Sequence, residues 1–454
     1  MALTDFTIIR RSMLSRLFST VTTILTVAVA AGLMLVLLSM RDAGRKAFER
    51  GAGNMHLLVS ADSAALPAIL NGIFYANPPQ RPITWEKYQQ IASSFPWEYA
   101  IPVQMGDSYR SQPVMATTRE FFYAYMPDIE IPWMLDDGRF FDDGEGGDFQ
   151  IILGAAAAKA TGLHVGDKIH LTHGAGTGAA GGAGHEHSEY QYTVIGILRP
   201  SGTPHDRALF TNLESAWIIH AHDRIERAEL AAAATAPVDT HTSSGDTEHA
   251  HDEAEHRVGR NDLIPEDRRI TGIYLRVMTR PGSDATAALA QIFDQLRRDT
   301  SITVAQPAQQ IRNLFTIVGN IDQIFLGLAG VVMASSGIAV MLALYNSMEQ
   351  RRRQIAVLRV LGCSRGRIFG LVLTESAMLG LLGALAGVIL CAIGMHIVAA
   401  IMKAKLGLII DTHLHWPFTL GLVLVTVLLA ALAGVVPAVM AYRTSVARNL
   451  KPIG

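Results

Sequence analysis

The chain has 454 residues, of which 50% are apolar, and its formal net charge at pH 7 is -2. Its mean hydropathy of +0.26 is positive, which at this length indicates a protein that lies partly in lipid and partly in water. The near-neutral charge gives no reason to expect nucleic acid as a partner. The two cysteines, Cys363 and Cys391, both fall in the C-terminal third, so the long hydrophilic middle of the chain has no cysteine with which to form a disulfide.

The N-terminal region predicts a basic lead followed by a membrane helix. Residues 1–19 are expected to form a short amphipathic segment at the inner membrane surface, and residues 20–40 the first transmembrane helix. That apolar run has the ~17–25 residues needed to cross a bilayer and is longer than the ~7–15 residues of a signal-peptide core. Arg41, Arg45 and Lys46 follow it in place of a small-residue cleavage site, so we expect the helix to be retained. Gly32 favours close packing against a neighbouring helix.

Residues 51–320 predict a water-soluble domain of mixed α and β texture. The β-α-β pattern at its C-terminal end predicts one subdomain built from both flanks of the region, with a second subdomain inserted between them. From residue 306 onward the chain is expected to continue as a helix into the second membrane span. Strands are expected at 55–60, 99–104, 150–153, 168–171, 191–198, 208–211, 272–277 and 301–304, and helices at 155–160, 284–298 and 85–93, the last behind Thr84 as N-cap.

Two histidine-rich segments, 173–187 and 220–256, interrupt this domain. They are rich in small polar residues and poor in apolar ones, which is typical of loops that cannot bury enough surface to order themselves. Imidazole and carboxylate groups suit Zn²⁺, with Cu²⁺ and Ni²⁺ as alternatives, but the spacing makes no tetrahedral structural motif. Two interpretations stay open: zinc binding of modest affinity, or solvated filler at an insertion point. The candidate zinc ligands are His185, His187, His220, His222, His241, His249, His251 and His256.

The last third of the chain predicts three further transmembrane helices, at 321–345, 370–402 and 417–442. The third helix is longer than one crossing needs, so either its ends project or it breaks near Gly394. The segment 349–369 carries an excess of arginine, which places a short loop on the cytoplasmic side. Its apolar positions predict a short amphipathic helix, a turn at Gly362 and the start of the next span. The tail, 443–454, is again basic, so both termini are expected in the cytoplasm.

The predicted fold class is an α-helical membrane domain of four transmembrane helices with an α/β (α+β) extracytoplasmic domain inserted between helices 1 and 2. The run RRRQIAVLRVLGCSRGRIFGLVLTES, at 351–376, resembles the cytoplasmic loop and following helix of the MacB/FtsX-type ABC transporter permeases. The motifs at 138–141, 166–167 and 194–196 resemble the periplasmic core domain of that family. The resemblance implies that the loop couples the permease to an ATPase. Its candidate coupling residues are Arg351, Arg352, Arg353, Arg359, Leu361, Gly362 and Arg365.

The sequence has no G-x-x-x-x-G-K-[ST] motif and no H-E-x-x-H motif, so the chain is not expected to be an enzyme that hydrolyses ATP by itself. The resemblance then implies a separate ABC ATPase subunit and a second permease, as a homodimer or heterodimer, in a bacterial inner membrane. A periplasmic adaptor or substrate protein is a further expected partner. Apart from Asp322 at the very start of the second span, Glu375 is the one acid inside a predicted span, and a hinge or interface role is favoured over a proton relay.

The function expected from the resemblance is to relay ATPase-driven motion across the membrane to the periplasmic domain. Export, extraction of lipoproteins or lipids, mechanotransmission and a link to zinc handling stay open as its purpose. Two alternatives from other classes remain: a membrane-anchored periplasmic protein that binds or senses metal, and a regulator of a cell-wall hydrolase.

Overall fold

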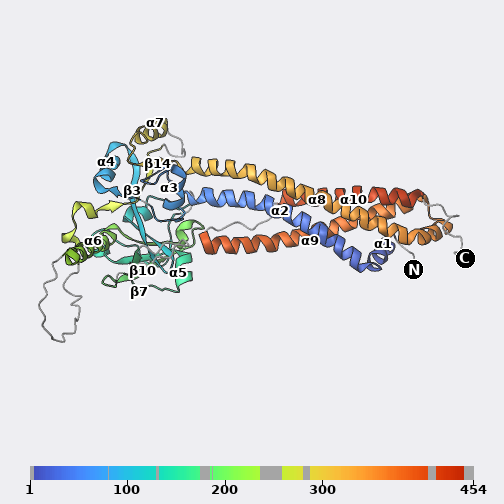
Figure 1. Ribbon diagram of the computed structural model, residues 1–454, viewed down its shortest axis with the longest axis horizontal. Helices are drawn as coiled ribbons and strands as arrows, with labels where there is room; N and C mark the ends of the chain where they lie inside the picture. Colours follow the sequence, from blue (N-terminus) through green and yellow to red (C-terminus); the bar gives the residue numbers. More distant parts are fainter. Residues whose placement is uncertain are drawn as a thin grey trace, which may run out of the picture. The chain divides into compact units, whose positions relative to one another are not determined.

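The computed structural model of the chain describes residues 5–79, 81–128, 132–173, 185–186, 188–235, 258–279, 287–406 and 416–443. The chain divides into two compact units. The helical unit comprises residues 1–45, 315–401 and 410–454, and the sheet unit comprises residues 46–314 and 402–409. Each unit is treated separately below, with the element labels of Figure 1.

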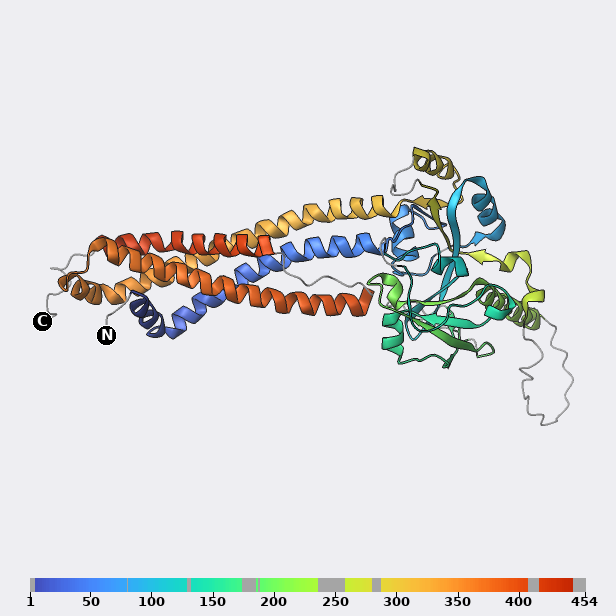
Figure 2. The same cartoon turned by 180° about the vertical axis from the view of Figure 1, so that it is seen from behind.

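The helical unit is built from one short and four long helices that run side by side in both views (Figures 1 and 2). The four long helices each contain a stretch that is long and apolar enough to cross a membrane, at 17–51, 323–348, 365–402 and 416–443. The predicted membrane domain of four helices is therefore confirmed. The helices are α1 (Asp5–Leu14), α2 (Leu17–Gly51), α8 (Pro307–Val360), α9 (Arg365–Leu406) and α10 (Trp416–Arg443).

The long helices approach one another at glycines. A Cβ atom placed on Gly387 of α9 would lie 2.9 Å from the carbonyl oxygen of Ala28 and 3.0 Å from the backbone nitrogen of Gly32, both in α2. Nearer the start of α9, Ser376 occupies the space in which a side chain at Gly434 of α10 would lie. Small residues allow membrane helices to come this close, and the close packing predicted at Gly32 is confirmed. α9 continues unbroken through Gly394, so of the two alternatives stated for this long span, projecting ends or a break near Gly394, the break is not formed.

The sheet unit is organised around one mixed sheet that contains twelve strands among the described residues. Nine of them follow the order β14-β1-β13-β3-β4-β11-β6-β10-β5, while β7 pairs with β10, and β8 links β3 to β9. The two predicted subdomains thus share a single hydrogen-bonded sheet, joined where β4 pairs in parallel with β11. The strands are β1 (Leu57–Ser60), β3 (Trp97–Tyr109), β4 (Gln112–Thr117), β5 (Leu135–Gly138), β6 (Gln150–Leu153), β7 (Lys168–Ile169), β8 (Thr172–His173), β9 (His185–Glu186), β10 (Tyr192–Leu198), β11 (Leu209–Asn212), β13 (Gly272–Val277) and β14 (Thr303–Ala305).

Helices cover this sheet and close two apolar clusters. The first cluster contains apolar residues from strands near both ends of the domain, such as Leu57 and Ile273. Trp217 packs in the same cluster. The second gathers Ile151, Tyr192 and Leu209 from the middle of the chain. The predicted cap is confirmed, since the backbone nitrogen of Lys87 donates to Thr84 Oγ1 at 3.3 Å. The helices are α3 (Ala65–Gly72), α4 (Trp85–Ser94), α5 (Ala155–Thr161), α6 (Leu213–Thr235) and α7 (Ala287–Leu296), and a two-stranded sheet pairs β2 (Ile83–Thr84) with β12 (Arg269–Ile270).

A buried histidine lies among aromatic rings on the short helix Pro204–Arg207. Its two ring nitrogens face the hydroxyls of two tyrosines: Nδ1 of His205 is 2.6 Å from Tyr75 Oη, and Nε2 is 3.0 Å from Tyr125 Oη. Phe121 and Trp133 stand edge-on to the same imidazole. Complete burial disfavours the imidazolium and lowers the pKa of His205 to about 3. The residue is therefore a neutral part of the core.

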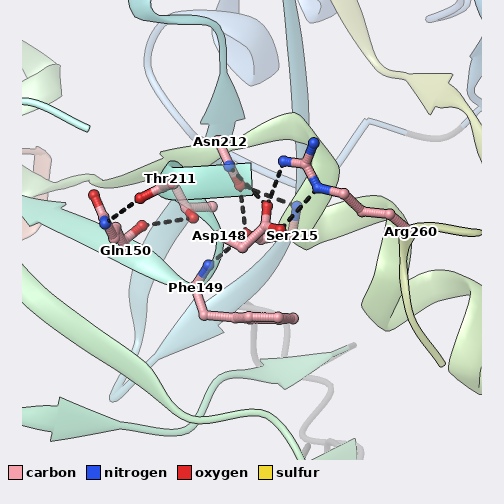
Figure 3. A network of polar contacts seen from close by, with 8 residues as sticks. Asp148, Phe149, Gln150, Thr211, Asn212, Ser215 and Arg260 are labelled. Carbon is pink, nitrogen blue, oxygen red and sulfur yellow. Dashed lines mark hydrogen bonds and ion pairs between the residues drawn. The ribbon is translucent and has the colours of Figure 1, made fainter. Parts of the chain in front are cut away.

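A polar network fixes the start of α6 (Figure 3). The guanidinium of Arg260 donates to both carboxylate oxygens of Asp148, at 2.8 Å and 2.7 Å. Asn212 donates to the same carboxylate at 3.2 Å and accepts a hydrogen bond from the backbone nitrogen of Ser215 at 3.0 Å, as an N-cap residue does. Ser215 Oγ in turn accepts from the backbone nitrogen of Phe149 at 2.7 Å. Three separated parts of the chain are thereby joined.

Candidate coupling site at the turn between α8 and α9

The arginine-rich segment lies at the end of α8 and does not form a helix of its own. Residues 349–360 continue α8 without interruption, which corrects the prediction of a separate short helix. The reason is that no glycine or proline stands between Tyr345 and Val360, so nothing ends the helix that precedes them. The segment is helical, as its pattern predicts, but it forms the last turns of a longer helix.

The turn ends α8 with a glycine and begins α9 with a capping serine. Gly362 has a φ of +93°, the left-handed conformation with which glycine commonly ends helices. The carbonyl of Arg359 accepts a hydrogen bond from the Gly362 backbone nitrogen at 3.1 Å. Ser364 then caps α9, because its Oγ accepts from the backbone nitrogen of Arg367 at 3.2 Å. These features place the predicted turn at Gly362.

Residues 362–366 also read G-C-S-R-G, which satisfies the G-x-S-x-G pattern of hydrolase nucleophile elbows. That motif requires a strand before the serine, and here the preceding element is α8. The Ser364 hydroxyl accepts the capping hydrogen bond described above. The arrangement therefore supports a helix cap rather than a nucleophile.

One side of the turn is packed and the other is open. Met348, Ile355, Ile368 and Val372 form a buried cluster with Ala438 and Ala441 of α10. The side chains of Val357, Val360 and Leu361 are 45%, 63% and 78% exposed. We call these three residues the exposed apolar tip. Exposed apolar side chains grouped in this way are typical of a surface that contacts another protein.

Arginines flank the exposed apolar tip along the chain. Arg365 is exposed, and its guanidinium carbon lies 5.8 Å from the ring centroid of Tyr442 in α10, a cation–π distance. Arg359 is half-buried. Arg351, Arg352 and Arg353 lie on the helical backbone just before the tip, and their side chains are outside the described part of the chain. The predicted coupling residues Leu361, Gly362 and Arg365 are thus brought together in one turn.

The N-terminal lead contacts this region. Arg367 and Asp5 form an ion pair at 2.6 Å, and Ser12 Oγ donates to Glu375 Oε1 at 2.5 Å. Arg16 donates to the carbonyl oxygen of Ser347 in α8 at 3.0 Å. Asp5, Ser12, Ser364 and Tyr442 were not among the residues singled out from the sequence. Only Ser364 had a local signal, a serine two residues after a glycine and directly before a basic helix start.

Of the predicted zinc ligands, His220 and His222 are the two whose side chains the structure describes. His222 stands edge-on to Tyr190, with ring centroids 5.4 Å apart, and Nε2 of His220 lies 3.9 Å from Asp107 Oδ2. His185 is described in its backbone as part of β9. His187, His241, His249, His251 and His256 fall outside the described residues. Within the described part of the chain, no group of three or more potential metal ligands is found.

Comparison with known proteins identifies both units. A family model described as the MacB-like periplasmic core domain matches residues 20–295, and a model described as the FtsX-like permease C-terminal region matches residues 326–446. Among solved structures, the chain is similar to the extracellular domain of the noncanonic ABC-type transporter YknZ from Gram-positive bacteria. That match has 11% identity and a TM-score of 0.26 and covers 55% of this chain and 98% of the other.

Two curated relatives carry the description of uncharacterized ABC transporter permeases. One, from Methanocaldococcus jannaschii, is 21% identical over 168 residues, which cover 36% of this chain and 42% of the relative. The other, YknZ from Bacillus subtilis, is 32% identical over 123 residues, covering 27% and 28% of the two chains. The matches thus span less than half of each relative. The family models between them account for most of the chain, and it belongs to the MacB/FtsX type of ABC transporter permeases.

Proposed function

We propose that this chain is the permease subunit of an ABC transporter and that the turn between α8 and α9 receives the motion of a separate ATPase subunit. The observation that carries the proposal is the exposed apolar tip, Val357, Val360 and Leu361, beside the exposed Arg365. Apolar side chains flanked by basic residues can pack into an apolar recess of a partner protein. Acidic residues of the partner around that recess can orient the contact.

The motion would travel along α8. This helix continues from Pro307 to Val360, so a displacement imposed on its last turns can pass along an unbroken hydrogen-bonded backbone. Packing of the last turns against α9 and α10 through Met348, Ile355 and Ile368 would make the three helices move together. Export, lipoprotein or lipid extraction and mechanotransmission remain alternative uses of that motion, and a role in zinc handling remains a proposal.

The proposed topology places the turn and both termini in the cytoplasm of a bacterial cell and the sheet unit outside. The arginine excess at 351–367 supports it. Cys363 supplies a native probe because it is half-buried in the turn, whereas Cys391 is buried. A membrane-impermeant maleimide should leave Cys363 unlabelled in intact cells and label it after membrane disruption. His164→Cys, on the exposed surface of the sheet unit, should be labelled in both cases. Labelling of Cys363 in intact cells would overturn the topology.

The proposed complex contains two ATPase subunits and a second permease, identical or similar, with a periplasmic adaptor or substrate protein as a further partner. Affinity purification of the full chain from native membranes tests this composition. Recovery of a protein with an ATP-binding motif supports the transporter. Recovery of a cell-wall hydrolase without an ATPase would favour the regulator, and recovery of neither would favour the metal sensor.

Leu361→Asp tests the coupling site. A carboxylate at the centre of the apolar tip would have to be desolvated on contact, which costs several kcal/mol, so we expect the chain-dependent part of the ATPase rate to be lost. Arg359→Asp should act in the same direction. Leu361→Met is the matched control, since it keeps the apolar volume, and it should preserve the rate. Equal rates for Leu361→Asp and Leu361→Met would reject the assignment.

A further inference from the structure

A polar cavity of about 520 Å³ lies in the sheet unit where separated parts of the chain meet. Its described lining comes mainly from β3, from the middle of α6 and from the segment that contains β12. Cavities that bind small molecules in proteins measure about 300–1,000 Å³. The cavity is therefore large enough for a small molecule, and polar side chains make up most of its described wall.

Hydrogen bonds within the protein hold the walls of this cavity in place. The guanidinium of Arg224 in α6 donates to both carboxylate oxygens of Asp267, at 2.7 Å and 2.9 Å. The backbone nitrogen of Met105 in β3 donates to Thr271 Oγ1 at 3.0 Å. These bonds connect the three parts of the wall. The cavity is therefore preformed, and a ligand does not have to order it on binding.

Gln104 of β3 supplies a buried hydrogen-bond acceptor to this wall. The residue is 8% exposed, and its Oε1 accepts no hydrogen bond from any described residue. A buried amide oxygen without a donor is costly, and few such groups remain in folded proteins. The terminal torsion of a glutamine side chain is soft, so the oxygen can turn toward a donor in the cavity. We therefore expect a ligand to supply that donor.

Two further arginines give the same wall a positive charge that a ligand can reach. Arg227 and Arg269 line the cavity and are both exposed. Each donates through Nε to a backbone carbonyl, that of Asp223 at 2.9 Å and that of Glu266 at 2.7 Å. Neither arginine forms an ion pair with a carboxylate among the described residues. The remaining N–H groups of each guanidinium can therefore bind a carboxylate or a phosphate.

We propose that this cavity binds a small organic anion that carries hydroxyl groups, either a hydroxy acid or a polyol phosphate. The anionic group lies against Arg227 and Arg269, and a hydroxyl donates to Gln104 Oε1. A hydroxyl can donate and accept at the same time, which suits a wall that offers both an acceptor and arginine donors. The described lining contains three arginines and two acids, and this excess of positive charge favours an anion. The proposal does not depend on coupling to an ATPase.

The test measures the binding of matched probes to the full chain in detergent by saturation-transfer NMR, which detects weak ligands. Glycerate and glycerol 3-phosphate carry both an anionic group and hydroxyls. Propionate and methyl phosphate keep the anionic group without the hydroxyls, and glycerol keeps the hydroxyls without the charge. Glycerate or glycerol 3-phosphate should bind about fivefold more tightly than these three, the ratio that corresponds to one net hydrogen bond. Which of the two binds distinguishes a carboxylate ligand from a phosphate ligand.

Variants of the three proposed ligand-binding side chains connect this binding to the cavity. Gln104→Leu removes the acceptor at similar volume, so it should bring the affinity of the hydroxylated probe down to that of its counterpart without hydroxyls. The melting temperature should stay the same or rise, because a buried oxygen without a donor is removed. Arg227→Gln and Arg269→Gln should each weaken binding of the anionic probe about tenfold.

Arg268→Gln is the matched control. Arg268 is the exposed neighbour of Arg269 in the chain and does not belong to the described lining of the cavity, so the variant should bind the probe as the unaltered chain does. Equal losses in Arg268→Gln and Arg269→Gln would overturn the proposal. Failure of both hydroxylated anions to bind more tightly than their comparators would overturn it as well. If Gln104→Leu lowers the melting temperature, Gln104→Met takes its place.

Discussion

Ser12 and Glu375 are 363 positions apart in the chain, yet the Ser12 hydroxyl donates a 2.5 Å hydrogen bond to the Glu375 carboxylate. Both side chains are buried. The bond joins α1 to α9, so Glu375 lies at a contact between two helices, while the preference for an interface role over a proton relay stays a prediction. Whether the carboxylate also acts as a hinge stays a prediction.

Ser12→Ala should destabilise the helical unit. The substitution removes the donor from a buried acceptor, and such losses cost about 1–3 kcal/mol. Thermal unfolding in detergent should show a lower melting temperature than that of the unaltered chain. Ser15→Ala is the control, because Ser15 is exposed and its hydroxyl bonds locally to the carbonyl of Ser12. Equal melting temperatures for the two variants would contradict an interface role for the Ser12–Glu375 bond.

The stability of the protein should fall as the pH is lowered below about 6.5, in part because of His205. Its folded-state pKa is about 3, whereas an unfolded histidine has a pKa of about 6.5. Above pH 6.5 both states are neutral at this residue, and below it only the unfolded state gains the proton. The loss from this residue should reach about 2 kcal/mol at pH 5. Denaturant unfolding at pH 7 and pH 5 measures the difference, and His205→Phe should show a shallower pH dependence.

Asp148→Ala should destabilise the sheet unit by about 1–3 kcal/mol, since it leaves the partly buried guanidinium of Arg260 without its two-bonded partner. The exposed pair of Arg139 and Asp142, at 4.0 Å, provides the comparison. Arg139→Ala should change the free energy of unfolding by less than about 0.5 kcal/mol. Denaturation followed by tryptophan fluorescence distinguishes the two. A similar small effect of both substitutions would show that the network in Figure 3 contributes little.

Gly387→Val should disrupt the contact between α2 and α9. The added atoms would overlap the backbone of α2 near Ala28 and Gly32, so the helices must separate and lose packing. Gly421→Val in α10 is the matched control, because no described atom lies within 4 Å of a Cβ at that position. The first variant should purify poorly or melt well below the second. Indistinguishable melting temperatures would mean that this close approach is not required.

The parts of the fold that rest on local patterns could be predicted from the sequence. The four spans follow from uninterrupted apolar length, and the helix behind Thr84 follows from a cap with its expected hydrogen bond. The sheet could not be predicted in the same way. Its two halves join through β4 and β11, where Val114 pairs with Leu209, and no local pattern reports a pairing over such a separation.

The turn at Gly362 could be predicted from the sequence, but the length of the helix before it could not, and coupling at this turn stays a prediction. The alternation of arginine with apolar residues correctly indicated a helix ending at Gly362, while only the structure shows that it is the end of α8. The backbone pairing of Asp107 in β3 with His173 in β8 was not predicted either, because strand register depends on pairings that local spacing does not reveal.

The two ends of the described part of α10 carry aromatic residues that bear on how the helical unit fits a membrane. α10 begins at Trp416, which is 74% exposed, and it ends one residue after Tyr442. At ~1.5 Å per residue these two aromatic rings lie ~40 Å apart along the helix axis, which matches the ~40–45 Å thickness of a bilayer with its headgroups. Aromatic residues prefer those two interfaces. The described part of α10 therefore places an aromatic ring at each interface of a bilayer, and a membrane thinner than this would be accommodated by tilting of the helix.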